Sequence, residues 1–324
     1  MKEVIVTGTH YECGLQVGKV FAGAIQWRLQ HHTITEQEIQ KHHAAFDLMV
    51  TQVAKAFPGY VEELQGMAEG AGVSLRQLLF LNCAELSQYH HGCSSIACVE
   101  NSEKHSRVYL AHNEDGDVEE KKTSCALVTY KLPNNSFTSF CYPGELPGCA
   151  YSWNKYGLFF TVNYINVEPK KRFFPRYFIS RKLLEATSCT EAIAILRQFA
   201  CDSAFHIFIG QGEEIYSVEQ YYEKVSVNKV MGTYYHTNHL IHGLFKSTIY
   251  GSTMERFKRL TNLMPFVDPV TVLFDVQGRP KPLYACKGDV SKTLSTVVFE
   301  PLRGKVVVYP TRRLSSKVEF KLKK

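Results

Sequence analysis

Residues 1–92 have the apolar spacing of packed helices after a short first strand. Apolar side chains recur at helical spacing in four segments, at residues 15–25, 46–57, 58–67 and 75–81. Pro58 suits the first turn of a helix, and the Gly-rich segment 68–74 interrupts the pattern. The sequence therefore predicts two or three packed helices in this part of the chain.

From Cys93 onward the pattern changes to alternating and β-branched stretches, which are typical of strands. These stretches are residues 94–99, 107–113, 125–132, 158–165, 205–210, 214–220, 224–230, 232–238, 295–300 and 305–310. Helical spacing returns at about 175–200 and about 252–266, and the basic segment 317–324 is interpreted as an edge strand or tail. We expect a sheet sandwich covered by helices, with a boundary inside one fold at the segment HHGCSSIAC.

The composition is that of an ordinary globular protein. With 324 residues, 45% hydrophobic and 21% charged, the chain can form one large domain or two tightly joined ones. This excludes disordered, collagen-like and coiled-coil proteins. The 37 basic and 31 acidic residues give a net charge of +6, and the basic residues are scattered except at the C-terminal end. We therefore expect no nucleic-acid partner.

The ten cysteines lack the CxxC pairs of zinc ribbons and the density of a secreted disulfide scaffold. The N-terminus lacks the apolar stretch of a signal peptide, and no apolar run approaches the roughly 20 residues that span a bilayer. These features predict reduced thiols, no membrane partner and a cytoplasmic protein.

Gly92-Cys93 offers a route to self-cleavage. A glycine can hold its peptide in conformations closed to other residues, and it lets the following thiol reach its own preceding carbonyl. An acyl shift from nitrogen to sulfur, followed by hydrolysis, would leave Cys93 as a new N-terminus. Its α-amine, with a reference pKa of about 7.7–8.0, could then act as base for the thiol. The alternative is that Cys93 is a buried small hydrophobe, as free cysteines usually are.

Several motifs stand near this residue or follow it. They are GCSS at 92–95, HNED at 112–115, NKYGLFFTVNY at 154–164, HTNH at 236–239 and the SxxxR pattern that ends at Arg256. Together with GTHYECGLQVGKVF and PGYVEELQGMAEGAGVSLRQLLFLN in the first part, they span nearly the whole chain. The chain resembles the acyl-coenzyme A:6-aminopenicillanic acid acyltransferase family of N-terminal-nucleophile cysteine hydrolases.

The resemblance implies an α+β fold, a four-layer αββα sandwich with an N-terminal helical propeptide segment. It implies a precursor cut between Gly92 and Cys93, so that residues 1–92 become a small chain and residues 93–324 the catalytic chain that begins at the nucleophile. By this resemblance Cys93 is the nucleophile, Asp115 hydrogen-bonds near its amine, and Asn238 donates to the oxyanion.

The resemblance also implies supporting residues. Asn163 is a second amide of the site, Arg256 keeps it electropositive and holds Asp115, and Ser95 assists self-cleavage. Three of these residues also have an interpretation that involves no catalytic role. Asp115 also fits an ordinary turn, and Asn163 and Asn238 could be strand-end amides bonded to local backbone.

His236, His239 and His242 have a spacing that suggests a metal, but no nearby cysteine or carboxylate completes a closed set of ligands. Hydrogen bonding by these histidines is the better interpretation, and we expect neither a metal nor an organic cofactor. The basic run 170–172, with Arg176, could hold the phosphates of a coenzyme A thioester, although a solvated loop is the simpler interpretation.

The predicted function is hydrolysis of a non-protein C–N amide bond through a thioester on Cys93. Within the family the chain resembles animal members that hydrolyse β-alanyl conjugates of biogenic amines. A β-alanyl group ends in an ammonium, so its pocket should present a carboxylate, for which Glu114, Asp117 and Glu145 are candidates. The alternatives are an acyl-coenzyme A-dependent N-acyltransferase that uses the same thioester and a non-catalytic binding protein. The expected partners are a small N-acyl amine substrate, the two chains of one precursor, and a second copy in a possible homodimer.

Overall fold

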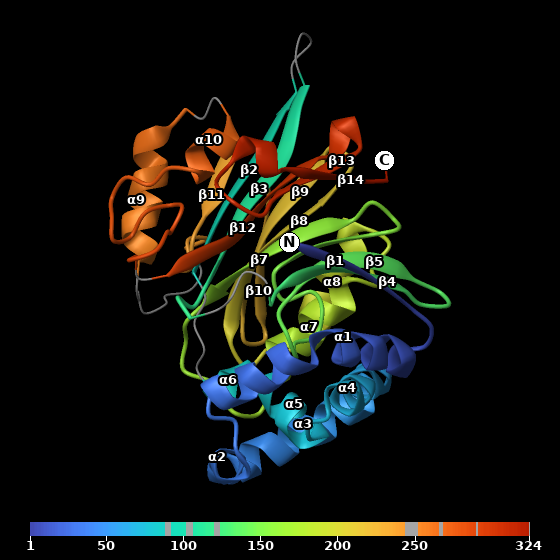
Figure 1. The fold of residues 1–324 in the computed structure, drawn as a ribbon. Coiled ribbons are helices and arrows are strands. Elements are labelled where there is room, and N and C mark those ends of the chain that lie inside the picture. The colour runs from blue at the N-terminus through green and yellow to red at the C-terminus, as the bar shows by residue number, and fades with distance from the viewer. Residues whose placement is uncertain are drawn as a thin grey trace.

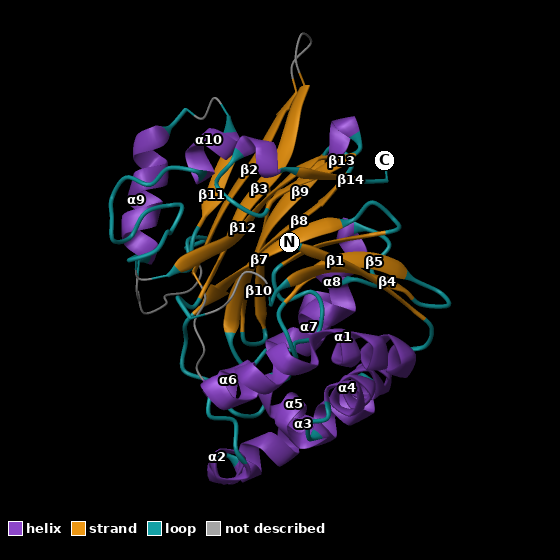
Figure 2. Cartoon of the chain, viewed as in Figure 1, coloured by secondary structure: helices purple, strands orange, loops and turns teal. Residues whose placement is uncertain are grey.

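The computed structural model describes residues 1–87, 92–101, 106–119, 124–243, 252–265, 268–289 and 291–323. Its strands lie in the centre of the molecule and its helices lie on two sides of them (Figures 1 and 2). The helices are α1 (His10–His31), α2 (Glu36–Lys41), α3 (His43–Ala56), α4 (Pro58–Ala71), α5 (Leu75–Leu81), α6 (Ala84–Ser87), α7 (Arg176–Leu183), α8 (Cys189–Gln198), α9 (Thr253–Leu263) and α10 (Pro269–Leu273). Short 3-10 turns lie at Pro301–Arg303 and Leu314–Ser316.

In the described part of the chain, the strands form two sheets. One has eight strands in the order β1-β4-β5-β6-β7-β8-β9-β10, and the other has six in the order β11-β2-β3-β12-β13-β14. The strands are β1 (Lys2–Thr7), β2 (Gly92–Asn101), β3 (Ser106–Gly116), β4 (Ala126–Lys131), β5 (Ser136–Cys141), β6 (Tyr151–Asn154), β7 (Phe159–Ile165), β8 (Ala204–Gln211), β9 (Glu214–Tyr221), β10 (Lys224–Lys229), β11 (Gly232–His236), β12 (Lys292–Glu300), β13 (Lys305–Tyr309) and β14 (Val318–Lys321). Neighbouring strands are antiparallel except β1 and β4, which are parallel. The predicted C-terminal edge strand is confirmed, because β14 lies at the edge of the six-stranded sheet.

Alternation along β2 shows how the layers form. Ala97 and Val99 lie in the core between the two sheets, whereas Ile96 and Cys98 lie in a core shared with α9 and α10. Strand β7 of the other sheet behaves in the same way: Phe159 faces the core between the sheets, and its outward face packs in a core shared with α1, α3, α4, α7 and α8. The order is therefore helix, sheet, sheet, helix, and the predicted αββα sandwich is confirmed.

The N-terminal helices join this fold closely. Strand β1 pairs with β4 in the eight-stranded sheet, and apolar residues of α1, α3, α4 and α5 share one core with that sheet. Helix α1 begins with the reciprocal cap of Thr9 and Glu12, and α4 ends at Gly72, whose φ of 65° suits glycine. The division into segments 1–92 and 93–324 stays a prediction, but the two segments share a sheet and a core.

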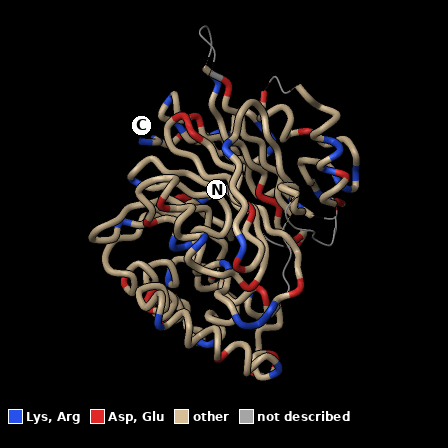
Figure 3. The backbone as a smooth tube through the Cα atoms, turned by 180° about the vertical axis from the view of Figure 1, so that it is seen from behind, with Lys and Arg blue, Asp and Glu red and all other residues tan. Residues whose placement is uncertain are grey.

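The predicted helices 46–57, 58–67 and 75–81 correspond to α3, α4 and α5. The helical pattern at 175–200 is divided into α7 and α8, because Ser188 caps a new helix by accepting from the Glu191 N–H at 3.1 Å. The change of pattern at HHGCSSIAC coincides with the start of β2 at Gly92, while residues 88–91 lie outside the described residues. Basic and acidic positions are interspersed along the chain (Figure 3). No helix among the described residues is both long and apolar enough to cross a membrane.

Helices α1 and α4 pack with their backbones in contact. A Cβ added at Gly14 of α1 would lie 1.9 Å from the Glu63 carbonyl oxygen, and one at Gly66 of α4 would lie 2.0 Å from the Tyr11 carbonyl oxygen. Backbone atoms cannot move away cheaply from such an approach. The two helices can therefore meet at this distance only with glycine at the crossing.

We expect Gly66→Ala to destabilise the protein by about 1–3 kcal/mol, because the added methyl group forces α1 and α4 apart. Gly23→Ala in α1 is the matched control, since no atom lies within 4 Å of its added Cβ. The control should be neutral or should stabilise by up to about 1 kcal/mol through helix propensity. Urea unfolding of both variants in the Cys93→Ala background measures this. Equal stability of the two variants would contradict the backbone contact.

Candidate active site

The β2–β3 pairing brings two of the sequence motifs face to face. In this antiparallel register Gly92 lies opposite Asp115, Cys93 opposite Glu114 and Ser95 opposite His112. Residues of GCSS and HNED are therefore cross-strand neighbours, although some twenty positions separate them along the chain. Because alternate residues share a face, Cys93 and Ser95 project toward the eight-stranded sheet.

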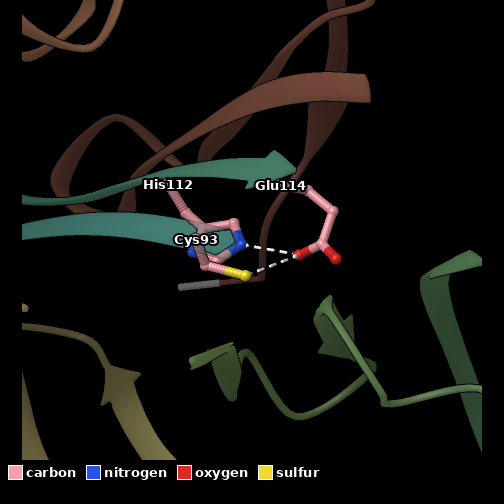
Figure 4. Close-up of side chains that lie close together, drawn as sticks. All are labelled: Cys93, His112 and Glu114. Atoms are coloured by element: carbon pink, nitrogen blue, oxygen red, sulfur yellow. Dashed lines mark hydrogen bonds and ion pairs between the residues drawn. The ribbon is translucent and has the colours of Figure 1, made fainter. Parts of the chain in front are cut away.

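Cys93 is 2% exposed, and different residues bond its N–H, carbonyl and thiol. Its N–H donates to Asn238 Oδ1 at 3.0 Å, and its carbonyl accepts from Arg256 Nη1. Its Sγ lies 3.6 Å from Glu114 Oε2 (Figure 4). Cys93 is thus contacted through its N–H, its carbonyl and its thiol by residues from distant parts of the chain.

The environment disfavours a thiolate in this state. Burial raises the pKa of the Cys93 thiol well above its usual range, and the carboxylates of Glu114 and Asp115 raise this pKa further. The Arg256 guanidinium acts in the opposite direction. The thiol is therefore protonated at neutral pH and needs a proton acceptor before it can attack a carbonyl.

Arg256 comes from α9 and reaches the start of β2. Besides the Cys93 carbonyl, it donates to Ser94 Oγ at 3.0 Å, Asn238 Oδ1 at 2.5 Å and Ser252 Oγ at 2.8 Å. Burial lowers the pKa of this arginine and the nearby Asp115 opposes that change, but a guanidinium stays charged. The structure thus places the predicted arginine at the site as a buried cation.

Asp115 lies on the other side of Gly92. Its Oδ1 accepts from Thr293 Oγ1 at 2.6 Å. A Cβ added at Gly92 would lie 3.5 Å from both Asp115 Oδ2 and Arg256 Nη2, so Gly92 sits between the two charges. Gly92 is the first residue of strand β2.

Asn163 on β7 reaches the site through Ser95. Ser95 Oγ lies 2.7 Å from Asn163 Oδ1 and 2.8 Å from His112 Nδ1, and His206 Nδ1 lies 3.4 Å from the same amide oxygen. Among the described residues, no hydrogen-bond partner is found for the buried Nδ2 of Asn163. Asn238 differs, because its Nδ2 donates to the Tyr164 carbonyl at 2.8 Å. An amide donor is thus free in Asn163 and engaged in Asn238.

A small cavity lies beside Cys93, with room for about one water molecule. It is lined by Cys93, Glu114, Tyr142, Glu145, Cys149, Val162, Tyr164, Arg176 and Tyr177. Two of the three predicted carboxylates, Glu114 and Glu145, line it. Glu145 also pairs with the buried Arg28 of α1 at 2.6 Å. Asp117 is exposed in a turn and accepts from the Glu119 N–H at 2.9 Å, so the structure does not bring it to the cavity.

Sequence reasoning missed His112, Tyr142 and Arg28. His112 lies inside the HNED motif and could have been found there, because it is two residues before Glu114 on the same face of β3. Tyr142 and Arg28 carry no local signal. They reach the cavity only because the segment after β5 and helix α1 fold against it.

The predicted histidine trio forms hydrogen bonds. His236 Nε2 lies 3.3 Å from Glu219 Oε1, His239 Nδ1 lies 2.9 Å from Thr253 Oγ1, and His242 lies between two serine hydroxyls. Burial lowers the pKa of His239 to about 4. The hydrogen-bonding interpretation of these residues is confirmed.

The basic run is divided by the fold. Residues 170–172 are exposed, and the N–H groups of Lys171 and Arg172 donate to the Asp202 carboxylate at 2.7 and 3.1 Å. Arg176 is instead buried and lines the cavity. The solvated-loop interpretation is confirmed for 170–172, and Arg176 does not belong to that loop.

Among the described residues, one group of metal-capable side chains has its ligand atoms within 4.8 Å of one another: Cys93, His112 and Glu114. Glu114 Oε2 lies 2.9 Å from His112 Nε2 and 3.6 Å from Cys93 Sγ (Figure 4). Tyr142 donates to the other carboxylate oxygen at 2.6 Å. Hydrogen bonds account for the whole cluster, and we interpret it as an acid–base group.

The model of one protein family, acyl-coenzyme A:6-aminopenicillanic acid acyl-transferase, matches residues 101–313. The chain belongs to this family. The match includes Asp115, Asn163, Asn238 and Arg256, and it begins shortly after Cys93. The matched region thus includes the carboxylate, amide and guanidinium groups that surround the thiol in this structure.

A curated relative, β-alanyl-dopamine/carcinine hydrolase of Drosophila melanogaster, is 28% identical over 246 residues, which are 65% of this chain. The chain spans 62% of the length of that relative. Two solved structures of conjugated bile acid hydrolase variants from Clostridium perfringens align at 13% identity, with TM-scores of 0.33 and 0.35. Each alignment covers 71% of this chain and 84% of the other.

We expect Arg256→Met to destabilise the protein by about 3 kcal/mol, because the buried acceptors on Cys93, Ser94 and Asn238 each lose a donor. Arg259→Met on the same helix is the control. Arg259 pairs with Asp275 in a partly exposed position, where we expect its loss to cost less than that of the fully buried Arg256. Urea unfolding in the Cys93→Ala background measures the difference. A loss for Arg256→Met no larger than that for Arg259→Met would contradict the structural role given to this cation.

Proposed function

We propose that this protein is an N-terminal-nucleophile amide hydrolase that cuts its own chain before Cys93 and then uses this cysteine to cleave a small, non-protein amide. The observation that carries the proposal is the arrangement around Cys93. Asn238 holds its nitrogen, Arg256 holds its carbonyl, and Glu114 contacts its thiol. Membership of the acyl-transferase family supports the same chemistry.

After the cut, the nitrogen of Cys93 becomes a free α-amine. Asn238 Oδ1 is placed to accept a hydrogen bond from this amine, and Asp115 and Arg256 lie beside the preceding residue. An amine with a reference pKa of about 7.7–8.0 can take the proton of its own thiol and later pass a proton to the leaving amine. Water then resolves the thioester.

The oxyanion of each tetrahedral intermediate needs a fixed donor. The buried Nδ2 of Asn163 supports an assignment of this role to Asn163, since its oxygen is already held by Ser95. Asn238 Nδ2 donates to the Tyr164 carbonyl, so the first role of Asn238 is to orient the amine through its Oδ1. Its Nδ2 can donate to the oxyanion only after the hydrogen bond to the Tyr164 carbonyl breaks. One such donor is typically worth about 2.7–4 kcal/mol of barrier.

The cavity supports an amine-bearing acyl group. Glu114 and Glu145 both line it, and Glu145 is already neutralised by Arg28, whereas Glu114 is held by His112 and Tyr142. Glu114 is thus the better partner for the ammonium of a β-alanyl group. The name of the Drosophila melanogaster relative agrees with that substrate class.

Residues 1–92 would stay bound after the cut, because β1 is part of the eight-stranded sheet. The cavity of the uncut chain has room for about one water molecule and admits no amide substrate, so we expect the precursor to be inactive. Acyl transfer to an amine is the second candidate function. The family description supports it, and it uses the same thioester.

We expect the mature protein to consist of two associated chains, residues 1–92 and 93–324, and Cys93→Ala to remain a single chain. Denaturing electrophoresis with intact-mass measurement checks this. Cys98→Ala is the control, since Cys98 lies on the same strand and faces α9 and α10, and it should be cut normally. A fully active protein found as one uncut chain would refute self-cleavage.

For the mature protein we expect kcat/KM for β-alanyl-dopamine or β-alanyl-histamine to exceed that for the N-butanoyl amide by at least about 100-fold. The butanoyl group has the same length but leaves the cavity carboxylate without a cation. Amine release measured by chromatography gives the ratio. Equal rates would contradict the charged pocket, and faster acyl transfer from an acyl-coenzyme A to an amine would replace hydrolysis by the acyltransferase function.

A further inference from the structure

Self-cleavage meets a chemical problem that turnover does not. In the uncut chain the nitrogen of Cys93 belongs to a peptide bond, so the α-amine that serves as base in the proposed mature enzyme does not yet exist. Burial keeps the Cys93 thiol protonated in this state. The first reaction therefore needs a proton acceptor from elsewhere in the chain.

Glu114 is in contact with this thiol. The cross-strand pairing of Cys93 and Glu114 brings Oε2 to 3.6 Å from Sγ, and the Glu114 side chain is almost fully buried. Asp115, the neighbouring carboxylate, pairs across the strands with Gly92 instead and accepts from Thr293. Contact with the thiol thus singles out Glu114 as the group that can take the proton.

Hydrogen bonds around Glu114 determine where protons lie. Asn163 Oδ1 can only accept, so Ser95 Oγ donates to it and in turn accepts from His112 Nδ1–H. The other ring nitrogen, His112 Nε2, faces Glu114 Oε2 at 2.9 Å. One proton must lie between these two atoms, because two lone pairs would repel. Tyr142 donates to the second carboxylate oxygen.

Glu114 therefore accepts from Tyr142 and from the thiol, and it shares a proton with His112. The guanidinium of Arg256 donates to the Cys93 carbonyl, so it lies close enough to stabilise a thiolate once the thiol has lost its proton. A carboxylate in contact with the thiol and a buried guanidinium beside it form a site that can remove a proton from sulfur and stabilise the resulting negative charge.

We propose that Glu114 is the general base of self-cleavage, oriented by His112 and Tyr142; this rests on the proposed maturation at Gly92–Cys93. Glu114 takes the proton of Sγ, and the sulfur attacks the Gly92 carbonyl carbon to form an S–C bond. The C–N bond then breaks, and the Cys93 nitrogen receives that proton. The products are a thioester and a free α-amine. Water hydrolyses the thioester to the Gly92 carboxylate and restores the thiol.

The test follows the cut in freshly translated full-length chain by electrophoresis. Glu114→Gln keeps the shape of the side chain but replaces one acceptor oxygen with an NH₂ group and removes the base, and we expect cleavage to slow by about 10²–10⁴-fold. Glu85→Gln is the matched control. Glu85 is also a buried glutamate, but its oxygen accepts from the Arg176 N–H and Ser203 Oγ, away from the thiol. The control should be cut at the wild-type rate.

The pH dependence distinguishes a base from a structural residue. The ionisable groups facing Glu114 are Cys93 on β2, His112 on β3, Tyr142 after β5 and Tyr151 on β6, with Asp115 and Arg256 acting on the thiol. Wild-type cleavage should reach a plateau once the base is ionised. In Glu114→Gln the residual rate should rise about tenfold per pH unit without a plateau, as hydroxide replaces the base. A constant factor of loss at every pH would overturn the proposal.

Hydroxylamine, which cleaves thioesters, locates the step. It should fail to restore cutting in Glu114→Gln, because no thioester forms without the base. Restored cutting would place Glu114 after the acyl shift and overturn the proposal, as would wild-type cutting in this variant. If circular dichroism shows that Glu114→Gln does not fold, His112→Asn tests the pairing of His112 with Glu114. This variant should be cut more slowly than wild type, and the pH dependence of its cleavage rate should differ. An unchanged pH dependence would refute the role of the pair.

The outcomes separate this inference from the proposed function. An uncut wild-type chain, or a cut Cys93→Ala chain, would refute maturation itself. A wild-type chain that is cut normally, together with a Glu114→Gln chain that is cut equally well, would refute only the role of Glu114.

Discussion

The register between β2 and β3 is the constraint on which the rest of the site depends. It sets Cys93 opposite Glu114 and Ser95 opposite His112, and a slip of one residue would turn these side chains to the opposite face. Packing on both faces of β2 holds the register. Ala97 lies in the core between the sheets, while Ile96 lies in the core with α9 and α10. The chemistry therefore depends on the same alternation that builds the sandwich.

This register places ionisable groups where water does not reach them, so each needs a partner within the protein. Arg256 donates to the Cys93 carbonyl and to Asn238, Glu114 accepts from Tyr142 and lies within hydrogen-bond distance of His112, and Glu145 pairs with Arg28. Buried charges of this kind are costly even when paired. Their concentration beside one thiol indicates a site maintained for chemistry rather than for stability.

The N-terminal part of the chain shapes the site as well as covering the sheet. Arg28 of α1 donates to the Pro143 carbonyl at 3.1 Å and pairs with Glu145. Asn82 accepts from the Leu146 N–H and donates to the Gly144 carbonyl, each at 2.8 Å. The segment from Tyr142 to Cys149, which lines the cavity, is thus held by residues that precede the proposed cut. A small chain released from its covalent link would still define the pocket.

Much of the fold could be read from local patterns. Helical spacing predicted α3, α4 and α5, and alternation predicted β2, β3 and β7 near their observed limits. These elements follow from the chain itself, because one-sided burial leaves a period in the sequence. Short elements such as β6 and α10 leave too few residues for a period and were not predicted. The close packing of α1 on α4 could not be predicted either, because the need for glycine at Gly14 and Gly66 is evident only once both helices are in place.

The sequence by itself predicted the fold class and a set of candidate site residues, Cys93, Asp115, Asn163, Asn238 and Arg256, because each lies in a short stretch of chain that resembles the acyltransferase family. Only the tertiary structure decided what each of these residues touches. It excluded Asp117 from the cavity, gave the unengaged amide donor to Asn163, and added Arg28 and Tyr142. Those contacts arise where a helix or a loop packs onto a sheet. The spacing of residues within one short stretch of chain does not indicate which distant side chains that packing brings together.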